Sequence, residues 1–330
     1  MVYQYKKKDT SQMKLAFLYE HPTWSDQLLA HFDKRNILVE KVNLGELAFP
    51  TSDGCTFTHA ANRVNIMPSA DRDPRVVFQT IHYLNWLEIQ GVRIINGARA
   101  HMIGASKVMQ NAIFCALNLS HPRAIAIYRP EDALTAAQRI GFPLIIKPNI
   151  GGSGKGIEKF DNIEHLTLAV KNKMVDLGID HTALVQEYIQ SDGYVYRIEV
   201  LGSQLFYSIK QKIQEGHYNY CAADGCSVED GVLEAPQEDK DFDFCVIDSG
   251  NQINPFDVSS ETLNTVIDII KSCSADLGGV EYFVEAETGR EVFYDINPYS
   301  NFVSNGKALL GFEPEERYID YVLDCIAANE

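Results

Sequence analysis

The sequence has no apolar run long enough to cross a membrane. A spanning helix needs about 20 consecutive apolar residues, and no stretch of the 330 residues approaches that length. The opening residues, MVYQYKKKDTSQM, are too polar for a secretory signal, and the apolar run at 15–19 is too short for a signal core. We therefore expect a cytoplasmic protein that does not bind membranes.

Cysteines at disulfide or zinc spacing are also lacking. The seven cysteines are odd in number and scattered, which argues against a disulfide framework. Cys221 and Cys226 lie close together, but no second pair of Cys or His residues stands at ligand spacing. Free thiols in a reducing compartment are the expected state.

Basic residues are too few to balance the acidic ones. The chain has 29 Lys and Arg against 45 Asp and Glu, so its formal net charge is −16 at pH 7. A surface this acidic repels nucleic acid and anionic lipid, and we expect neither as a partner. One basic pocket could still hold a nucleotide, with a divalent cation between its phosphates and the acidic side chains of the protein.

Internal repeats and low-complexity segments are absent, and the composition is that of an ordinary globular chain. Strand and helix patterns alternate over the first hundred residues. Strands are predicted at 14–19, 37–42 and 93–96, with one helix that Ser25 could cap and a second helix over 74–90. This alternation predicts a small parallel sheet with helices on its faces.

After residue 105 the pattern changes to α+β with a mainly antiparallel sheet. Helices are predicted over 106–118, 129–141, 162–178, 261–277 and 314–328. Strands are predicted at 124–128, 142–148, 157–160, 183–189 and 194–214, and in a hairpin over 279–297 that turns at Thr288-Gly289. The acidic, turn-rich segment 224–257 is expected to form loops and short strands.

A Gly-rich loop, residues 151–156, is the strongest local signal. Its four glycines leave backbone N–H groups free to face anionic oxygens. A P-loop is excluded because Asn149 stands where its first Gly belongs and Gly156 follows the Lys; a dinucleotide fingerprint is excluded because Ile157 replaces its third Gly. With a strand pattern on each side, the loop is predicted to be a hairpin flap over an anionic ligand. A flexible surface hairpin is the alternative.

Four motifs in this order resemble the ATP-grasp superfamily, most of all its RimK-like branch of carboxylate–amine ligases. They are Ser106-Lys107, Lys147-Pro148 with the Gly-rich loop, Gln186-Glu187-Tyr188-Ile189, and Gly279-Val280-Glu281 with Tyr294-Asp295-Ile296-Asn297. The resemblance covers about residues 100–305. It implies an ATP-grasp fold behind an N-terminal parallel βαβ domain, the pre-ATP-grasp domain. The boundaries are a polar tail at 1–12, the pre-ATP-grasp domain at 13–103, a lobe with the Gly-rich lid at 104–189 and a C-terminal lobe with the metal site at 190–330.

The resemblance also implies a nucleotide site. Its residues are Lys107, Lys147, Gly151, Gly152, Ser153, Gly154, Lys155, Gln186, Glu187, Tyr188, Ile189, Asp192 and Asn219. The lysines would hold the phosphates of ATP, the glycines would cover them, and backbone groups of 186–189 would pair with adenine. The family has an acid two residues before its strand arginine, where this chain has Val195. Asp192 therefore becomes the candidate for the ribose contact.

The candidate residues for charge stabilisation and metal binding lie in the second half of the chain. By the same resemblance, Arg197 and Lys210 would stabilise the charge that develops on the reacting phosphate. Asp295 and Asn297 alternate on one strand, so their side chains share a face, and Glu281 lies on the partner strand. Three hard oxygen donors suit Mg²⁺ or Mn²⁺. Solvated polar residues on an exposed sheet are the alternative, which the apolar residues around them make less favourable.

The predicted activity is an ATP-dependent ligase that joins a carboxylate to an amine through an acyl-phosphate and releases ADP and phosphate. A small-molecule kinase and a non-catalytic ATP-binding regulatory protein are the alternatives. The substrates, a small-molecule or peptide carboxylate and an amine, stay unidentified because residues 55–75 and 215–257 match no known pattern. Arg63, Ser300 and Asn301 are candidate substrate or phosphate contacts. Whether the chain forms a homo-oligomer stays open.

Overall fold

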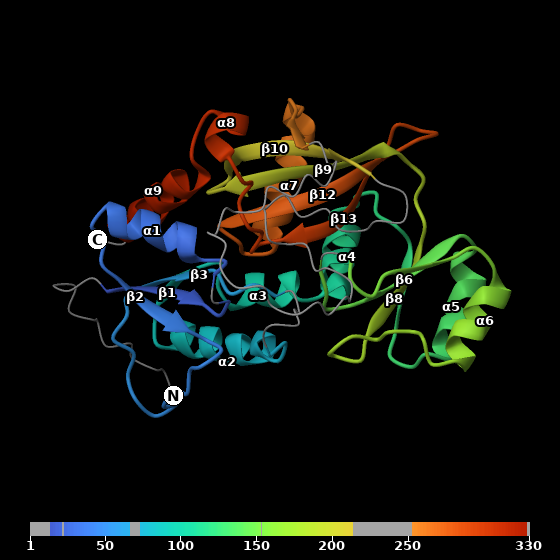
Figure 1. Ribbon diagram of the computed structural model, residues 1–330, viewed down its shortest axis with the longest axis horizontal. Helices are drawn as coiled ribbons and strands as arrows, with labels where there is room; N and C mark the ends of the chain where they lie inside the picture. The colour runs from blue at the N-terminus through green and yellow to red at the C-terminus, as the bar shows by residue number, and fades with distance from the viewer. Residues whose placement is uncertain (1–13, 22, 67–72, 153, 214–252, 329–330) are drawn as a thin grey trace, which may run out of the picture.

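The computed structural model describes residues 14–21, 23–66, 73–152, 154–213 and 253–328. Three β-sheets organise these residues, and they follow one another along the sequence. Figure 1 shows the first sheet at one end of the molecule, the second at the other end and the third between them. Among the described residues no helix is long and apolar enough to span a bilayer.

The first sheet is parallel throughout, as the alternating pattern predicts. Its order is β2-β1-β3-β4, formed by β1 (Leu15–Tyr19), β2 (Val39–Asn43), β3 (His59–Asn62) and β4 (Arg93–Ile95). Helix α1 (Asp26–Lys34) packs on the face that carries Leu15 and Phe17, and α2 (Val76–Ile89) packs on the face that carries Ala16 and Leu18. Both faces of β1 are therefore buried, as is usual for parallel strands.

Two local expectations for this sheet need correction. Strand β3 was not predicted, because His-Ala-Ala-Asn has no β-branched residue and takes its conformation from pairing with β1 and β4 on either side. Ser25 stands at the N-cap of α1, but its side chain makes no capping hydrogen bond because its backbone is already helical.

The second sheet carries helices on one face and leaves the other face to a cavity. Its order is β5-β8-β6-β7, all antiparallel, with β5 (Ala124–Ile127), β6 (Leu144–Pro148), β7 (Glu158–Phe160) and β8 (Ala183–Glu187). Leu144 and Ile146 pack under α5 (Asp132–Ile140) and α6 (Ile163–Lys171), whereas Ile145 and Lys147 face the cavity. Helix α6 ends seven residues earlier than predicted.

The third sheet is antiparallel and holds the predicted hairpin. Its order is β11-β10-β9-β12-β13, from β9 (Ser191–Leu201), β10 (Gln204–Lys212), β11 (Ile253–Pro255), β12 (Leu277–Glu285) and β13 (Glu291–Asn297). One face packs against α4 (Lys107–Ala116) and α7 (Ser260–Ser272). Helix α7 stops at Ser272 instead of 277, because Ser274 has a φ of +54°, which is incompatible with the helix, and Leu277 already belongs to β12. The combination of a parallel sheet with two antiparallel sheets confirms the predicted α/β and α+β fold class.

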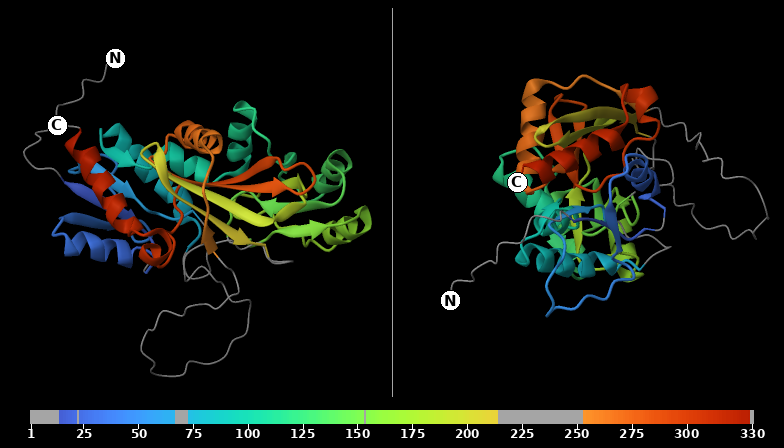
Figure 2. Two further views of the ribbon diagram at one scale, coloured as in Figure 1. Left: turned by 90° about the horizontal axis from the view of Figure 1, so that it is seen from above. Right: turned by 90° about the vertical axis from the view of Figure 1, so that its left-hand side faces the viewer.

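The first and third sheets share one hydrophobic core. The C-terminal helix α9 (Pro314–Ala327) packs beside α1, and Tyr318 and Ile319 contact the cluster that includes Phe17, Phe32 and Ile209. Figure 2 shows α9 and α1 together at one end of the molecule and α5 and α6 at the other end. Two further short helices, α3 (Ala98–Gly104) and α8 (Gly306–Leu310), were not predicted.

Asn96 joins these two sheets at the end of β4. Its backbone N–H donates to Asp276 Oδ2 at 2.9 Å, and its side-chain amide donates to the carbonyl of Leu277 at 2.9 Å. Asn62 and Tyr299 both donate to the carbonyl of Asn96, at 3.0 and 2.8 Å. The first sheet is thereby tied to the segment that follows β13, where several candidate site residues lie.

Candidate active site

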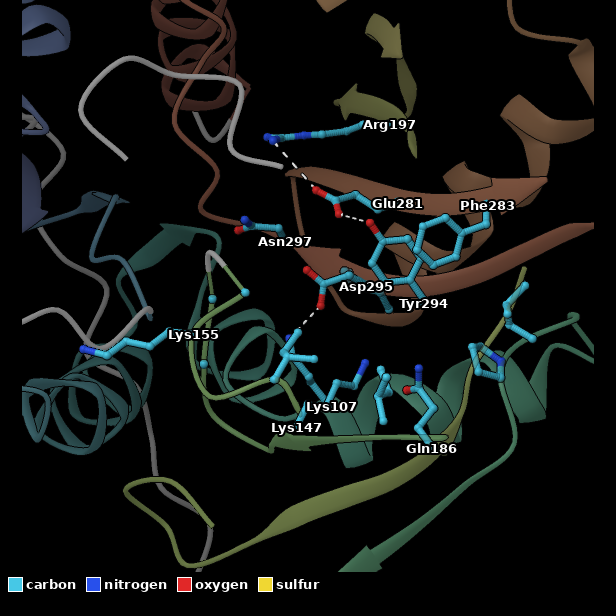
Figure 3. A pocket seen from close by; sticks show the side chains of 18 of the residues that line it. Lys107, Lys147, Lys155, Gln186, Arg197, Glu281, Phe283, Tyr294, Asp295 and Asn297 are labelled. Carbon is cyan, nitrogen blue, oxygen red and sulfur yellow. Dashed lines mark hydrogen bonds and ion pairs between the residues drawn. The ribbon is translucent and has the colours of Figure 1, made fainter. Parts of the chain in front are cut away.

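A cavity of about 840 Å³ lies between the second and third sheets. The structure brings together most of the predicted residues around this cavity. Its lining includes Lys107, Lys147, the Gly-rich loop, the 186–189 segment, Arg197, Glu281, Asp295 and Asn297. Figure 3 shows how side chains converge from the start of α4 and from β6, β8, β9, β12 and β13, namely those of Lys107, Lys147, Gln186, Arg197, Glu281 and Asp295. The cavity has an apolar end and a highly charged end.

Ile145, Tyr188, Ile189 and Phe283 line the apolar end, together with Gln186. The side chain of Gln186 is only 4% exposed, and its Oε1 has no hydrogen-bond partner among the described residues. A buried acceptor without a partner is costly in the folded protein. A hydrogen-bond donor on a bound ligand would therefore be stabilised here.

Two backbone N–H groups of the 186–189 segment are engaged within the protein. The N–H of Glu187 donates to the carbonyl of Arg123 at 3.0 Å, and the N–H of Tyr188 donates to that of Pro143 at 3.2 Å. The carboxylate of Glu187 is also engaged, since Arg123 Nε donates to it at 2.7 Å. The side chain of Gln186 is a further polar group of the predicted adenine-binding segment that could meet a base.

Two lysines bring positive charge to the other end of the cavity. Lys107 forms an ion pair with Asp295, with 2.8 Å between Nζ and Oδ1. Lys147, on β6, is only 3% exposed and forms no ion pair within the part of the chain that the structure describes. Burial and the nearby Lys107 lower the pKa of Lys147 to about 7, against the opposing effect of Asp295 and Glu281. A polyanionic ligand would supply the negative charge that Lys147 lacks.

Asn149 connects the strand of Lys147 to the helix of Lys107, a role that was not predicted. Its Oδ1 accepts hydrogen bonds from the N–H of Val108 at 3.0 Å and from Ser106 Oγ at 3.2 Å, at the start of α4. Its Nδ2 donates to Asp180 Oδ2 at 2.7 Å. Asn149 follows the strand of Lys147 and holds the helix of Lys107. The signal for it was its place directly after Lys147-Pro148.

The Gly-rich loop closes one side of the cavity. Gly151, Gly152, Gly154 and Lys155 line it, and the Lys155 side chain points away from Asp295 in Figure 3. Gly156 has φ +74°, and a Cβ there would lie 2.9 Å from Pro148 Cγ. This position therefore needs glycine both for its backbone conformation and for the close approach to β6. Ser153 lies outside the described residues.

The carboxylates of Glu281 and Asp295 stand opposite each other on β12 and β13. Burial first and Asp295 second raise the pKa of Glu281 to about 7. A β-bulge at Tyr294 shifts the pairing next to them, because Tyr282 pairs with Phe293. The bulge lets Tyr294 donate to Glu281 Oε2 at 2.6 Å while its ring stacks on Phe283 (Figure 3). Tyr294 was part of the recognised motif but was assigned no role.

These groups suit a divalent cation. Within the described residues there is no group of three or more His, Cys, Asp and Glu side chains placed to hold a metal, so the candidate set is two carboxylates and the amide of Asn297. Asn297 Oδ1 accepts from the N–H of Tyr299 at 3.0 Å and keeps a second lone pair. The mutual repulsion of Glu281 and Asp295 is what a bound cation would relieve. Oxygen donors of this kind fit Mg²⁺ or Mn²⁺.

Arg197 reaches the cavity from β9. It is only 5% exposed, and its guanidinium donates to Glu199 Oε1 from Nε at 2.7 Å and also from Nη2. Burial disfavours the charge, but neighbouring groups, with Glu199 first and Glu281 among them, outweigh burial and raise the pKa of Arg197. Nη1 stands 4.0 Å from Glu281 Oε1. Glu199 was not predicted, because an acid two residues after an arginine on a strand is not in itself a signal.

The structure does not bring Lys210 or Asp192 to the cavity lining. Lys210 pairs with Tyr196, whereas Arg197 pairs with Ile209, so the two basic residues lie on opposite faces of the sheet. The ammonium of Lys210 lies over the ring of Tyr194, 5.2 Å from its centroid. Asp192 is exposed and accepts from Tyr196 Oη at 2.8 Å.

The remaining candidates divide between the cavity and its surroundings. Ser300 and Asn301 line the cavity, and so does Asn65, shortly after β3, which was not predicted. Arg63 does not line it but donates from Nη2 to the carbonyl of Ser300 at 2.7 Å. Asn219, Cys221 and Cys226 lie outside the described residues.

Known proteins resemble part of this chain. Residues 107–200 match the family model described as "Carbamoyl-phosphate synthase L chain, ATP binding domain". The chain is 24% identical over 195 residues to Glutamate--LysW ligase ArgX of Sulfurisphaera tokodaii, covering 58% of this chain and 66% of that protein. It is 28% identical over 127 residues to a D-alanine--D-alanine ligase of Ectopseudomonas mendocina, covering 38% and 39%. The matched regions thus span less than two thirds of these relatives.

Solved structures resemble the whole chain. A RimK domain ATP-grasp protein from Sphaerobacter thermophilus superimposes with a TM-score of 0.64 at 15% identity, covering 94% of this chain and 99% of that one. The VanG D-Ala:D-Ser ligase from Enterococcus faecalis gives a TM-score of 0.66 at 14% identity, covering 96% and 100%. At these identities the likeness concerns the fold.

Proposed function

The chain has the ATP-grasp fold, and we propose that it is an ATP-dependent ligase that joins a carboxylate to an amine. The observation that carries this proposal is the charge arrangement of the cavity, where Lys107, Lys147 and Arg197 converge on Glu281 and Asp295. An apolar end beside this charged end suits a nucleotide, which has an apolar base and anionic phosphates. The relatives named above are ligases, which supports the same class of reaction.

In this proposal each part of the cavity has a task in holding ATP. The apolar end and Gln186 receive the adenine, and Lys107 and Lys147 contact the phosphate oxygens. The Gly-rich loop covers the phosphates with its backbone N–H groups. Phosphoryl transfer depends mainly on positioning and on fixed charge. The contacts of Asn149 fix the start of α4 and thus the backbone of Lys107, and burial on β6 restricts Lys147.

Glu281, Asp295 and Asn297 would hold the divalent cation. When bound there, Mg²⁺ or Mn²⁺ neutralises negative charge on the phosphates. Tyr294 keeps the carboxylate of Glu281 oriented through its hydrogen bond. Arg197 stabilises the charge that develops on the transferring phosphoryl group, since its Nη1 faces the same part of the cavity as Glu281.

The proposed reaction has two steps. An oxygen of the substrate carboxylate attacks the γ-phosphorus of ATP, the bond to ADP breaks, and an acyl-phosphate forms. The nitrogen of the amine then attacks the acyl carbon, phosphate leaves, and the amine loses a proton. The names of the relatives, a Glutamate--LysW ligase and a D-alanine--D-alanine ligase, support an amino acid or a peptide as one substrate.

Two measurements test this function. Mg·ATP should raise the melting temperature, because a ligand at 100 times its dissociation constant adds about 2.7 kcal/mol of stability. ADP release is then measured against panels of amino acids, dipeptides and small carboxylic acids, with hydroxylamine as the trapping amine. A ligase yields a hydroxamate from its acyl-phosphate, whereas a kinase yields a stable phosphorylated product. Binding of Mg·ATP without ADP release on any panel would favour the regulatory alternative and remove the ligase proposal.

A further inference from the structure

Glu199 is a buried carboxylate on which three donors converge. It is 0% exposed, and its Oε1 accepts from Arg197 Nε at 2.7 Å, from Arg197 Nη2, and from Ser300 Oγ at 2.7 Å. Its Oε2 has no hydrogen-bond partner within the described part of the chain. Because all three donors bind one oxygen, the other oxygen of the buried carboxylate lacks the hydrogen bonds that would stabilise it. This arrangement does, however, fix the position of the arginine.

The neighbouring strand makes room for this pair. Gly279 of β12 pairs with Glu199 of β9. A Cβ on Gly279 would collide with Glu199 Oε1 and would lie 3.1 Å from Arg197 Nε. The φ of Gly279 is not in the left-handed region, so backbone conformation does not explain the glycine. The space above it is filled by the Arg197–Glu199 pair.

The pair controls which edge of the guanidinium faces the cavity. Nε and Nη2 form one edge of a rigid plane, and both donate to Glu199. Fixing that edge fixes the direction of Nη1. Nη1 lies 4.0 Å from Glu281 Oε1, which is too long for a hydrogen bond, so its donors stay available. Arg197 and Ser300 line the cavity, and Glu199 does not.

We infer that Glu199 is a positioning residue, which holds one edge of the Arg197 guanidinium so that Nη1 faces the transferring phosphoryl group. Ser300 supports this arrangement from the segment after β13, and Arg63 of the first domain donates to the Ser300 carbonyl at 2.7 Å. The inference rests on the proposed function, because it assumes that a phosphoryl group is transferred beside Arg197. It does not depend on the identity of either substrate.

The test compares two affinities of the full-length protein, for Mg·ADP and for Mg·ADP with aluminium fluoride, an analogue of the transferring phosphoryl group. Glu199→Gln should weaken binding of the fluoride complex about tenfold or more, because an arginine that is out of place loses contacts with the phosphoryl analogue. Binding of Mg·ADP alone should change less than about threefold, since the lysines and the apolar end remain. Glu291→Gln, another carboxylate of the same sheet outside the cavity lining, is the matched control and should bind both ligands as wild type does.

A double-variant cycle separates positioning from a general structural effect. If Glu199 acts through Arg197, then Glu199→Gln combined with Arg197→Ala should lose no more fluoride-complex affinity than Arg197→Ala alone. Additive losses would overturn the inference. Glu199→Asp keeps the negative charge but moves it away from Arg197 by the length of one methylene group. This variant replaces Glu199→Gln in the test if the glutamine variant does not fold. It too should weaken the fluoride complex selectively.

Failure of the inference and failure of the ligase proposal give different results. Wild-type affinity for the fluoride complex in both Glu199 variants would overturn the positioning role and leave the ligase proposal intact. Selective weakening in a protein that forms no hydroxamate would support the positioning role and overturn the ligase. A wild-type protein that gains no affinity from aluminium fluoride would overturn both.

Discussion

Lys107 and Asp295 form an ion pair that joins the start of α4 to the last strand of the third sheet, with 2.8 Å between Nζ and Oδ1. Both side chains are largely buried. This pair balances one lysine of the cavity and leaves Lys147 beside it without an ion pair among the described residues. An anionic ligand would balance the charge of Lys147, and the four predictions below rest on the charges and the packing of this cavity.

The first prediction concerns Lys147→Met. Burial lowers the pKa of Lys147 from 10.5 to about 7 in the folded protein. Below pH 7, Lys147 is protonated in both the folded and the unfolded protein. Burying its charge then lowers the free energy of unfolding by a few kcal/mol, at about 1.4 kcal/mol per pKa unit. Between pH 7 and about 10.5 the unfolded state binds more protons, so this contribution to wild-type stability rises with pH. Without ligand, Lys147→Met should therefore be the more stable protein below pH 7, and its advantage should shrink above pH 7.

Denaturant unfolding of both proteins at several pH values measures this difference. Lys171→Met, at an exposed position in the last turn of α6, controls for the substitution itself. A stability difference that stays constant from pH 6 to 10 would contradict the burial of a charged lysine. The same variant should also lose most of its stabilisation by Mg·ATP.

The second prediction concerns Asp295→Asn, which keeps the shape of the side chain but removes one negative charge from the proposed cation site. Mg²⁺ prefers a carboxylate to an amide oxygen, so turnover should fall on the order of 10²-fold, equivalent to about 2.7 kcal/mol. Nucleotide binding should fall less. Stability should change little, because the loss of the Lys107 ion pair is offset by less repulsion of Glu281. ADP release and thermal melts measure these effects, with Asp268→Asn on α7 as the control. Full activity in a folded Asp295→Asn protein would remove the metal assignment.

The third prediction concerns Tyr294→Phe, which removes the hydrogen bond to Glu281 but keeps the stacking on Phe283. That hydrogen bond lowers the pKa of Glu281, so its loss should raise this pKa further. Hydrogen bonds to charged groups contribute roughly 1.5–3 kcal/mol. The concentration of Mg²⁺ needed for half-maximal stabilisation by ATP should therefore rise about tenfold or more. Tyr282→Phe, on β12 next to Glu281 but on the opposite face of the sheet, should leave this concentration unchanged. Equal behaviour of the two variants would argue against a role for the bulge.

The fourth prediction compares two glycines that have similar positive φ values. Gly156→Ala and Gly289→Ala both put Cβ in the left-handed region, at a cost of roughly 1–2 kcal/mol. Only at Gly156 does Cβ also clash, at 2.9 Å from Pro148 Cγ, whereas nothing lies within 4 Å at Gly289. Gly156→Ala should therefore destabilise the protein more and weaken Mg·ATP binding, and Gly289→Ala should leave binding unchanged. Chemical unfolding and nucleotide titrations test both points. Equal ATP affinity of the two variants would show that the loop does not depend on this contact.

Most of the local structure and most of the site could be predicted from the sequence. Some features depend on backbone geometry over a few positions, so neighbouring residues are enough to predict them. They include the apolar periods of the strands and helices, the glycines of 151–156 and the alternation of Asp295 with Asn297. The lysines and carboxylates of the cavity were identified because the motifs that contain them resemble those of the ATP-grasp family. The domain boundaries stay a prediction.

Contacts between distant segments were decided only by the tertiary structure. Strand β3 exists because β1 and β4 pair with it. Lys210 lies away from Arg197 because the register of β9 with β10 puts the two side chains on opposite faces, and a shift of one residue would reverse this. Glu199 holds Arg197 only because Gly279 and Ser300, from two other segments, leave room and donate a hydrogen bond. The sequence determined which charged groups the chain carries on each element, whereas the pairing of strands determined which of those charges meet, because side-chain direction in a sheet follows from register.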